Sequence, residues 1–389
     1  MIKVISATVV AVLLICWAVL EFVLPVKIEL SQNLIVPHES YAISSAAQTL
    51  HDRILVADLH TDSLLWKRDL NQYENRGHVD VPRLQAGNVA LQMFTAVTKS
   101  PEGQNYEENT SDSDNITYLV MAQLWPIKTW FSLLERTLYQ AGKLEEFASD
   151  SNGALVFVKS QRDLTAVLEQ RAKGNAQIAA LYGIEGAHPL EGQLDNVQTL
   201  FDVGVRMMGI THFFDNELAG SLHGISGDGL SDFGREVVLQ AVELGMIIDI
   251  AHVSPTAVKD ILALSPKPVI LSHGGMKGAC DSSRNLSDEL MQEVAAHGGL
   301  IGIGYWDGAV CDASPLGVVK SIRYAIDTLG VNSVALGSDY DGTVSVTFDT
   351  SELAVLTDTM LAQGFTEEEI TKVMGANAVD FFSRHLPND

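Results

Sequence analysis

Cysteine and basic residues are both scarce in this 389-residue chain. The three cysteines exclude a scaffold held by several disulfides, and because Cys16 lies in an N-terminal apolar run, only Cys280 and Cys311 remain for a single bridge. Lys and Arg number 25 against 49 Asp and Glu, which gives a net charge of −24. Nucleic acid is therefore excluded as a partner, since phosphate binding needs clustered basic side chains.

A long apolar run occurs only at the N-terminus. Between Val4 and Val26 the one charged residue is Glu21, and the run is long enough to span a bilayer as a helix. We favour an uncleaved membrane anchor over a cleaved signal peptide, because the run exceeds a typical signal core and no A-x-A site follows it. The expected parts are residues 1–26 as anchor or signal peptide, 27–48 as linker, and 49–389 as an exported domain in the periplasm or outside the cell, secreted if the N-terminus is cleaved.

The rest of the chain contains eight short apolar runs, each associated with a polar residue. In order they are ILVADLHTD with His60 and Asp62, VALQMFTAV with Gln92, AQIAALYGIE with Glu185, VRMMGITH with His212, MIIDIAH with His252, KPVILSH with His273, GLIGIGY with Tyr305, and SVALGSD with Asp339. Such runs, separated by helical periodicity, are typical of a parallel sheet whose strands are buried on both faces. Eight units predict one α/β domain, a closed (β/α)₈ TIM barrel.

Most of these polar residues fall at the C-terminal ends of the predicted strands, where the loops of such a barrel converge. At a single position, a turn former or a helix N-cap explains a terminal His or Asp equally well. The whole set is harder to explain in that way, because capping would favour Ser, Asn, Thr and Gly over four histidines and three acids. We therefore expect the functional site at this end of the barrel.

An insertion at residues 99–159, between the second and third predicted strands, supplies no strand of the barrel. Its first part is polar, and its second part has apolar residues at spacings of three and four, which predicts helix. Two interpretations stay open. The insertion covers the mouth of the site, or it only packs against the barrel.

A metal centre is indicated by the H-x-D pair that ends the first strand, His60 and Asp62. Residues i and i+2 of a strand point to the same side, so an imidazole and a carboxylate can share one ion. His252 and His273 supply two more nitrogens. Imidazole and carboxylate without thiolate suit zinc or another borderline divalent metal. His252 and His273 would hold a second ion, and Glu185 and a water would bridge it to the first.

Several longer motifs are similar to one known family. The segments DLHTDSL, YGIEGAHPL, ITHFFDN, DIAHVS, LSHGGM, SRNLSDELM and GSDYDG, in this order and spacing, resemble the membrane (renal) dipeptidase family of the amidohydrolase superfamily. The resemblance covers residues 50–383 and is specific as a set, above all in D-x-AHVS followed by SH and then RN. It implies a metal-dependent hydrolase barrel that cleaves dipeptides with two Zn²⁺ ions per chain, and it suggests a homodimer.

The resemblance also implies roles for single residues. The metal ligands would be His60 and Asp62 for one zinc, His252 and His273 for the other, and Glu185 as the bridge. Substrate and proton would be handled by Asp339 as proton carrier, His212 at the scissile carbonyl, Arg284 at the substrate carboxylate, and Tyr305 as a pocket tyrosine. The loop after His212 reads FFDNELAGS and departs from the N-T-P-W type of continuation, which leaves the substrate preference open.

The implied reaction is attack on the peptide carbonyl by a hydroxide that bridges the two metals. Zinc can lower the pKa of water to about 7. His212 and metal would stabilise the oxyanion, and Asp339 would pass the proton to the leaving amine. Arg284 would bind the free α-carboxylate and so restrict the substrates to short peptides.

The sequence leaves two alternative functions open, and it indicates structural roles for two residues near the predicted site. Another binuclear amidohydrolase, acting on a non-peptide amide, a lactone or an ester, would use the same barrel, but many such enzymes have H-x-H on the first strand and a bridging carbamylated lysine. This chain has H-x-D and no strand-end lysine. A non-catalytic binding protein on this fold would not need the full ligand set. His188 is expected to be structural, and Asp341 to hold a loop.

Overall fold

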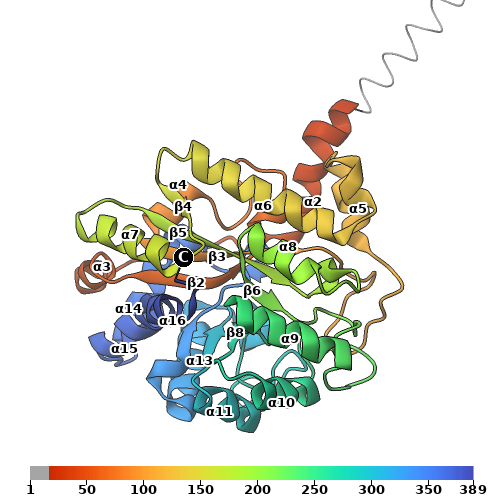
Figure 1. Ribbon diagram of the computed structural model, residues 1–389. Coiled ribbons are helices and arrows are strands. Elements are labelled where there is room, and N and C mark those ends of the chain that lie inside the picture. The colour runs from red at the N-terminus through yellow and green to blue at the C-terminus, as the bar shows by residue number, and fades with distance from the viewer. Residues whose placement is uncertain (1–16, 389) are drawn as a thin grey trace, which may run out of the picture.

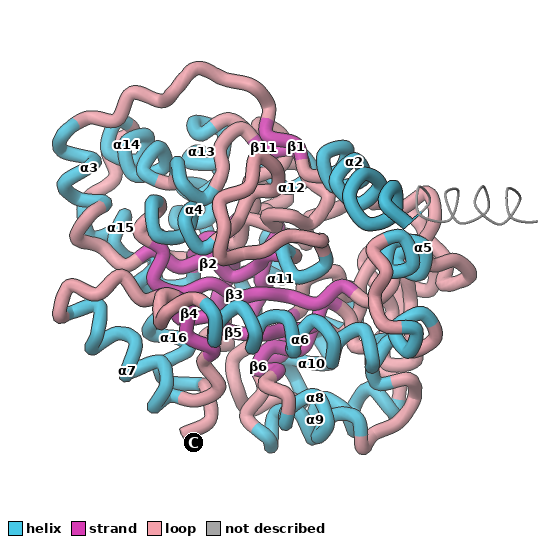
Figure 2. Tube along the Cα trace, turned by 90° about the horizontal axis from the view of Figure 1, so that it is seen from above, coloured by secondary structure: helices cyan, strands magenta, loops and turns pink. Residues whose placement is uncertain are grey.

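The predicted barrel is present in the computed structural model, which describes residues 17–388. Its strands in chain order are β2 (Val56–Thr61), β3 (Val89–Val97), β5 (Ile178–Glu185), β6 (Val205–Gly209), β7 (Ile247–Asp249), β8 (Ile270–Gly274), β9 (Leu300–Ile303) and β10 (Val334–Leu336). Neighbouring strands are parallel, and β10 pairs with β2 through Leu336 and Asp58, which closes the ring. Figures 1 and 2 show the strands at the centre and the helices around them.

The strands are apolar along their whole length because both faces are covered. Every residue of β2, β3 and β5 is buried. One apolar cluster joins alternate strand residues to the C-terminal helix, and it includes Leu59, Leu91, Leu181, Met207 and Phe382. A second, larger cluster contains the residues that face the surrounding helices. The two layers on either side of the sheet are those expected of a filled barrel.

Helices with one buried apolar face accompany the strands. They are α3 (Ser45–His51), α4 (Val81–Ala86), α7 (Gln161–Ala172), α8 (Asn196–Asp202), α9 (Asp232–Leu244), α10 (Pro255–Leu264), α11 (Asp288–Ala296), α12 (Asp307–Val310), α13 (Pro315–Leu329), α14 (Ala354–Ala362), α15 (Glu367–Thr371) and α16 (Asn377–His385). Several begin at a serine whose hydroxyl accepts from a backbone N–H of the first turn, as Ser254, Ser287 and Ser314 do.

The insertion at residues 99–159 contains α5 (Asn115–Ala122), α6 (Leu133–Asp150) and the short strand β4 (Leu155–Phe157). β4 pairs in parallel with the first residues of β5 and lies outside the closed ring. Arg136 of α6 holds the insertion together, because its guanidinium donates to the carbonyl O of Thr129 at 2.7 Å and pairs with Asp114 at 2.7 Å. The sequence prediction that no barrel strand lies here agrees with this arrangement.

The segment predicted as a linker, residues 27–48, and the end of the predicted anchor before it carry regular structure. A π-helical turn (Val19–Val23) leads into α2 (Leu24–Gln32), which lies beside α5, as Figures 1 and 2 show. Strand β1 (Leu34–Ile35) follows and pairs in parallel with β11 (Ser345–Val346), after the last barrel strand. From residue 17 to residue 388, no helix combines the length and apolar character needed to cross a bilayer. Residues 4–16 of the predicted span lie outside the described residues.

A close backbone contact at Gly375 holds the C-terminal helices against the barrel, and a disulfide restrains the chain between β8 and α13. A π-helical turn (Lys372–Ala376) between α15 and α16 approaches the start of β2 closely, and a Cβ on Gly375 would lie 2.2 Å from the carbonyl O of Leu55. Only glycine fits this approach. Cys280 and Cys311 form a disulfide with their Cα atoms 5.5 Å apart, so the bridge that the sequence left open is present.

Candidate metal centre

The predicted site residues meet at the C-terminal end of the barrel. Seven of them form one buried cluster, none more than 8 % exposed: His60, Asp62, Glu185, His212, His252, His273 and Asp339. They come from β2, β5 and β8 or from the loops that directly follow β2, β6, β7 and β10. The expectation that the strand ends bring these side chains together is therefore confirmed by the fold.

Three of the seven side chains point their ligand atoms at one another. The Nε2 atoms of His252 and His273 are 2.9 Å apart, and Glu185 Oε1 lies 3.0 Å from the first and 3.3 Å from the second. Burial lowers the pKa of both histidines well below the ordinary value, and nearby positive charge, including Arg284, lowers it further. Both rings are neutral at pH 7, which is the form of histidine that binds metals.

His60 lies among the acidic side chains. Its Nε2 is 3.5 Å from Asp62 Oδ1, 3.8 Å from Glu185 Oε1 and 3.9 Å from Asp339 Oδ1. Thr95 of β3 donates to Asp62 Oδ1 at 2.7 Å and so fixes that carboxylate. Burial by itself would lower the pKa of His60, but the three acids raise it to about 10. Positive charge is strongly favoured at this point of the cluster.

The donor set fits divalent cations. Burial, together with the charge of Asp62, raises the pKa of Glu185 well above its usual value and that of Asp339 to about 8. Carboxylates this close and this buried cannot all ionise without a counter-charge. Ligand atoms lie within 4.8 Å of one another in two overlapping sets: His60, Asp62 and Glu185, and Glu185, His212 and His252. Glu185 belongs to both sets, as a bridging ligand would.

Ser272 fixes the rings of His60 and His273. Its Oγ donates to Asp249 Oδ2 at 2.6 Å and lies 2.9 Å from Nδ1 of His273 and 3.2 Å from Nδ1 of His60. The single hydroxyl proton goes to the carboxylate, so the oxygen accepts from both Nδ1–H groups. Both Nε2 atoms are thereby left to face the cluster, an arrangement that orients histidine ligands in metal sites.

Sequence reasoning missed two buried aspartates behind the cluster. Asp249 comes within 4.8 Å of two histidine nitrogens, but it also accepts from the N–H groups of Ala251 and Ser272, so it supports the cluster rather than joining it. Asp58 accepts from Ser338 N at 3.0 Å and from Ser338 Oγ at 2.9 Å, which ties β2 to the loop after β10. Both stand two or three residues before a predicted ligand, in DLH and DIAH. An acid on a buried strand just before a ligand histidine is the signal that would have identified them.

His212 reaches the cluster from the loop after β6. Its Nε2 is 3.5 Å from Glu185 Oε2, and its Nδ1 lies 3.3 Å from the carbonyl O of Lys99 in the insertion. A carbonyl can only accept, so Nδ1 carries a proton and Nε2 is the atom that remains for a metal or a substrate. Burial lowers the pKa of His212 to about 4.

Arg284 is buried beside the two neutral histidines. Its Nη2 donates to the carbonyl O of His273 at 3.0 Å and lies 3.4 Å from Nε2 of His252. The guanidinium carbon is 5.5 Å from the ring centre of Trp306, which lines the cavity described below. Arg284 thus presents a fixed positive charge next to the cluster.

Tyr305 is not brought to the cluster. Its ring packs against Tyr340 and Phe348, with ring centres 5.4 and 5.2 Å away, and it is fully buried. The next residue, Trp306, faces the cavity in its place. Two other residues behave as expected: His188 is buried against Phe214, and Asp341 holds a loop by accepting from Ser63 and from the backbone N–H of His78.

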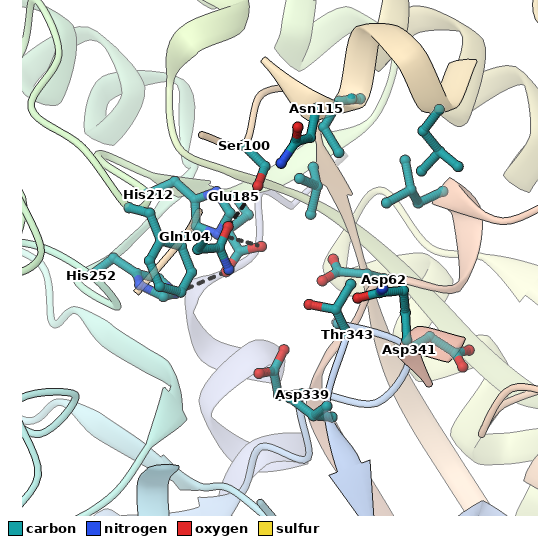
Figure 3. A pocket seen from close by; sticks show the side chains of 18 of the residues that line it. Asp62, Ser100, Gln104, Asn115, Glu185, His212, His252, Asp339, Asp341 and Thr343 are labelled. Atoms are coloured by element: carbon teal, nitrogen blue, oxygen red, sulfur yellow. Dashed lines mark hydrogen bonds and ion pairs between the residues drawn. The ribbon is translucent and has the colours of Figure 1, made fainter. Parts of the chain in front are cut away.

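A cavity of about 590 Å³ opens above the cluster. Figure 3 shows Asp62, Glu185, His212, His252 and Asp339 pointing into it from a strand end and from the loops that follow other strands. The first half of the insertion supplies further lining residues: Ser100, Gln104, Asn105, Tyr106, Asn115, Ile116 and Leu119. The second half packs on the barrel through buried residues of α6. Each of the two interpretations of the insertion therefore describes one half of it.

The backbone is strained at two residues of the cluster. His252 and Asp339 have left-handed conformations, with φ of 63° and 60°. Such conformations of non-glycine residues cost about 1–3 kcal/mol and persist where the surroundings impose them, as functional sites do. The strain accompanies the burial and the perturbed pKa values described above.

Known proteins share this sequence pattern and this fold. The family model described as membrane dipeptidase (peptidase family M19) matches residues 44–384. An amidohydrolase from Pseudomonas aeruginosa is 21 % identical, with a TM-score of 0.67 over 88 % of this chain and 99 % of that one. A metallo peptidase from Rhodobacter sphaeroides, liganded with a phosphinate mimic of the dipeptide L-Ala-D-Ala, is 21 % identical, with a TM-score of 0.69 over 85 % and 99 %. The probable dipeptidase PvdM from Pseudomonas aeruginosa is 20 % identical, with a TM-score of 0.70 over 87 % and 97 %.

Proposed function

Because the chain belongs to the membrane dipeptidase family, peptidase family M19, and is a metallo-dipeptidase, we propose that its buried cluster holds two zinc ions. The observation that carries this proposal is the position of Glu185. One of its oxygens lies 3.8 Å from His60, 3.0 Å from His252 and 3.3 Å from His273. A carboxylate that reaches both groups of histidines is suited to bridge two ions.

The ligands divide into two groups around this bridge. His60 and Asp62 would hold one ion, and His252 and His273 the other. Imidazole and carboxylate oxygen without thiolate suit zinc. When bound, the two ions would supply a water of lowered pKa and would polarise the peptide carbonyl.

Asp339 and His212 would carry out the proton transfer and charge stabilisation. Asp339 Oδ1 lies 3.9 Å from His60 Nε2, so its carboxylate is placed to take the proton from the attacking water and pass it to the leaving amine. His212 presents Nε2 to the same space. Burial keeps its ring neutral at pH 7, but the negative charge that develops on the oxyanion would favour the protonated ring, which would then donate from Nε2 to that oxygen. One well-placed donor of this kind is typically worth about 2.7–4 kcal/mol.

Arg284 would select substrates with a free C-terminal carboxylate, which its planar guanidinium can bind through two hydrogen bonds. The cavity of about 590 Å³ is of the size that takes small ligands. The phosphinate mimic in the Rhodobacter sphaeroides structure ends in D-Ala, so dipeptides with a D-residue at the C-terminus belong in the substrate test.

The catalytic domain would be exported and anchored by the N-terminal segment. The apolar run between Val4 and Val26 supports an anchor. The disulfide between Cys280 and Cys311 supports an oxidising compartment such as the periplasm or the outside of the cell. The homodimer suggested by the family resemblance stays a prediction.

Removal and return of the metal test the proposal. The full chain is solubilised, treated with a chelator, and assayed with dipeptides and longer peptides before and after addition of Zn²⁺. We expect zinc to restore cleavage of dipeptides only, and metal analysis to find about two ions per chain, as a bridged pair requires. Glu185→Gln should bind less zinc and lose at least about a hundredfold in kcat, the scale on which the loss of one transition-state contact is felt.

Glu217→Gln is the matched control, because Glu217 is exposed on the loop after His212. It should keep both zinc and activity. Two equivalents of zinc without dipeptide cleavage would indicate another amidohydrolase substrate. A chain that binds no metal would overturn the proposed centre.

A further inference from the structure

A helix that precedes the matched family region forms part of the cavity wall. α2 lies before residues 44–384, yet it contributes Ile28 and Gln32 to the lining. Ile28 packs against an apolar cluster that includes Leu65 and Ile116. Leu119 of α5 faces the same cavity. The wall on this side is therefore built by two neighbouring helices, one from the N-terminal segment and one from the insertion (Figures 1 and 2).

Glu29 anchors α2 through a buried ion network. Its side chain is 1 % exposed, and its carboxylate pairs with Arg68 at 2.5 Å and with Arg76 at 2.8 Å. Arg68 also pairs with Asp341, two residues beyond Asp339. Burying a charge is costly unless it is paired, so this network holds only when α2 is in its place. These ion pairs hold α2 in a fixed position, so the helix is an integral part of the cavity wall.

The residues after α2 attach to the same loop. Asn33 Oδ1 accepts from the backbone N–H of Thr343 at 2.9 Å, and the N–H of Leu34 donates to the carbonyl O of Val344 at 3.2 Å. Thr343 and Val344 both line the cavity. α2, β1 and the loop that carries Asp339 therefore form one connected unit.

The position of Arg284 decides which end of a dipeptide meets this wall. Figure 3 places His252 and Thr343 on opposite sides of the cavity. Arg284 lies beside His252, and α2 is attached beside Thr343. A dipeptide whose carboxylate is held by Arg284 directs its N-terminal residue toward α2.

We propose that Ile28, with Ile116 and Leu119, forms an apolar subsite for the side chain of the substrate's N-terminal residue. α2 then determines specificity, and the enzyme prefers dipeptides whose first residue is large and apolar. The inference rests on the proposed function, since it takes its direction from a carboxylate bound at Arg284. It concerns a segment outside the region that the family model matches.

The test uses the full chain loaded with zinc and four dipeptides, Gly-Ala, Ala-Ala, Leu-Ala and Phe-Ala. Ile28→Ala should lower kcat/KM for Leu-Ala and Phe-Ala by about three- to tenfold, mainly through KM, because part of an apolar wall is lost. The value for Gly-Ala should change by less than about twofold, because glycine makes no contact in this subsite. Ile28→Trp should fill the subsite and reduce cleavage of Phe-Ala far more than that of Gly-Ala. Leu30→Ala is the control, since Leu30 lies on the same helix, is 44 % exposed and does not line the cavity.

The outcomes separate this inference from the proposed function. A parent enzyme that cleaves no dipeptide would overturn both. Equal losses for all four dipeptides, or a fall in kcat with KM unchanged, would show that Ile28 acts only on the structure and would overturn the subsite alone. An unchanged preference in both Ile28 variants, with the thermal midpoint of the parent, would overturn it as well.

Discussion

The hydroxyl of Ser272 fixes the orientation of two histidine rings at once. It accepts from Nδ1–H of His60 and of His273 because its own proton is bound by Asp249. Ser272→Ala would remove the acceptor of both rings and leave them free to turn. We expect the affinity for zinc to fall by about 10- to 100-fold, as is typical when such a supporting contact is lost. Competition with a chelator of known affinity measures it.

Ser321→Ala is the control for this change. The Ser321 hydroxyl is buried in α13 and has no hydrogen-bond partner among the described residues. Its removal should leave zinc affinity unaltered and cost no hydrogen bond. If Ser272→Ala bound zinc as tightly as the parent chain, the hydroxyl would have no part in orienting the ligands.

Single residues differ in how far the sequence predicts them. The meeting of the proposed ligands could be predicted, because strand alternation and the shared end of a parallel barrel fix where their side chains point. The role of Asp249 could not, because it depends on Ser272 of a neighbouring strand. The prediction named Tyr305 as the pocket residue, but its neighbour Trp306 lines the cavity. The turn of the chain after β9 decides which of the two rings faces inward, and the sequence pattern does not reveal that turn.

Among the elements, α6 is docked on the barrel through Lys143. The Nζ of this partly buried side chain donates to the carbonyl O of Leu64 at 2.6 Å and of Trp66 at 2.8 Å. Burial and the nearby Arg68 lower the pKa of Lys143 to about 7, against 10.5 ordinarily, although Glu29 and Glu146 act the other way. Between pH 7 and 10.5 the unfolded chain keeps a proton that the folded chain has lost, so stability contributed at this residue rises with pH.

Lys143→Met should remove that pH dependence. We expect the thermal midpoint of the parent chain, relative to that of the variant, to rise from pH 6.5 to pH 9.5, because only the parent gains stability as the lysine deprotonates. Scanning calorimetry of both chains across this range measures the difference. A midpoint difference that stays constant with pH would show that the lysine keeps its ordinary pKa in the folded chain.

Elements were predictable where their pattern is local. The eight barrel strands follow from apolar runs of suitable length, and all eight are found. α2 was not predicted, because its residues continue the apolar run of the expected anchor and the partners of Glu29 lie far along the chain at Arg68 and Arg76. β4 was missed since three residues carry too little pattern.

For the whole molecule, the disulfide between Cys280 and Cys311 restrains a segment that contains Arg284. It closes 31 residues of chain, for which loop entropy gives a stabilisation of about 3.7 kcal/mol. The double variant Cys280→Ser and Cys311→Ser should therefore have a thermal midpoint lower by roughly 5 °C or more. It should also have a higher KM for dipeptides, because Arg284 is held less firmly. Dithiothreitol should lower the midpoint of the parent but leave that of the double variant unchanged, and an equal effect on both would contradict the prediction.

The pairing of the first and last barrel strands, β2 and β10, determines when the candidate metal centre can form during synthesis. The backbone N–H of Ser338, just after the last strand, donates to the carboxylate of Asp58 in the first strand, a contact that spans 280 residues. A ribosome delivers the first strand long before the last, and contacts of such separation form slowly. His60 and Asp62 therefore lack their neighbour Asp339 until most of the chain has been synthesised. If the chain is exported as proposed and crosses the membrane unfolded, it passes the translocation pore without an assembled centre, and the proposed zinc ions would be acquired on the far side of the membrane.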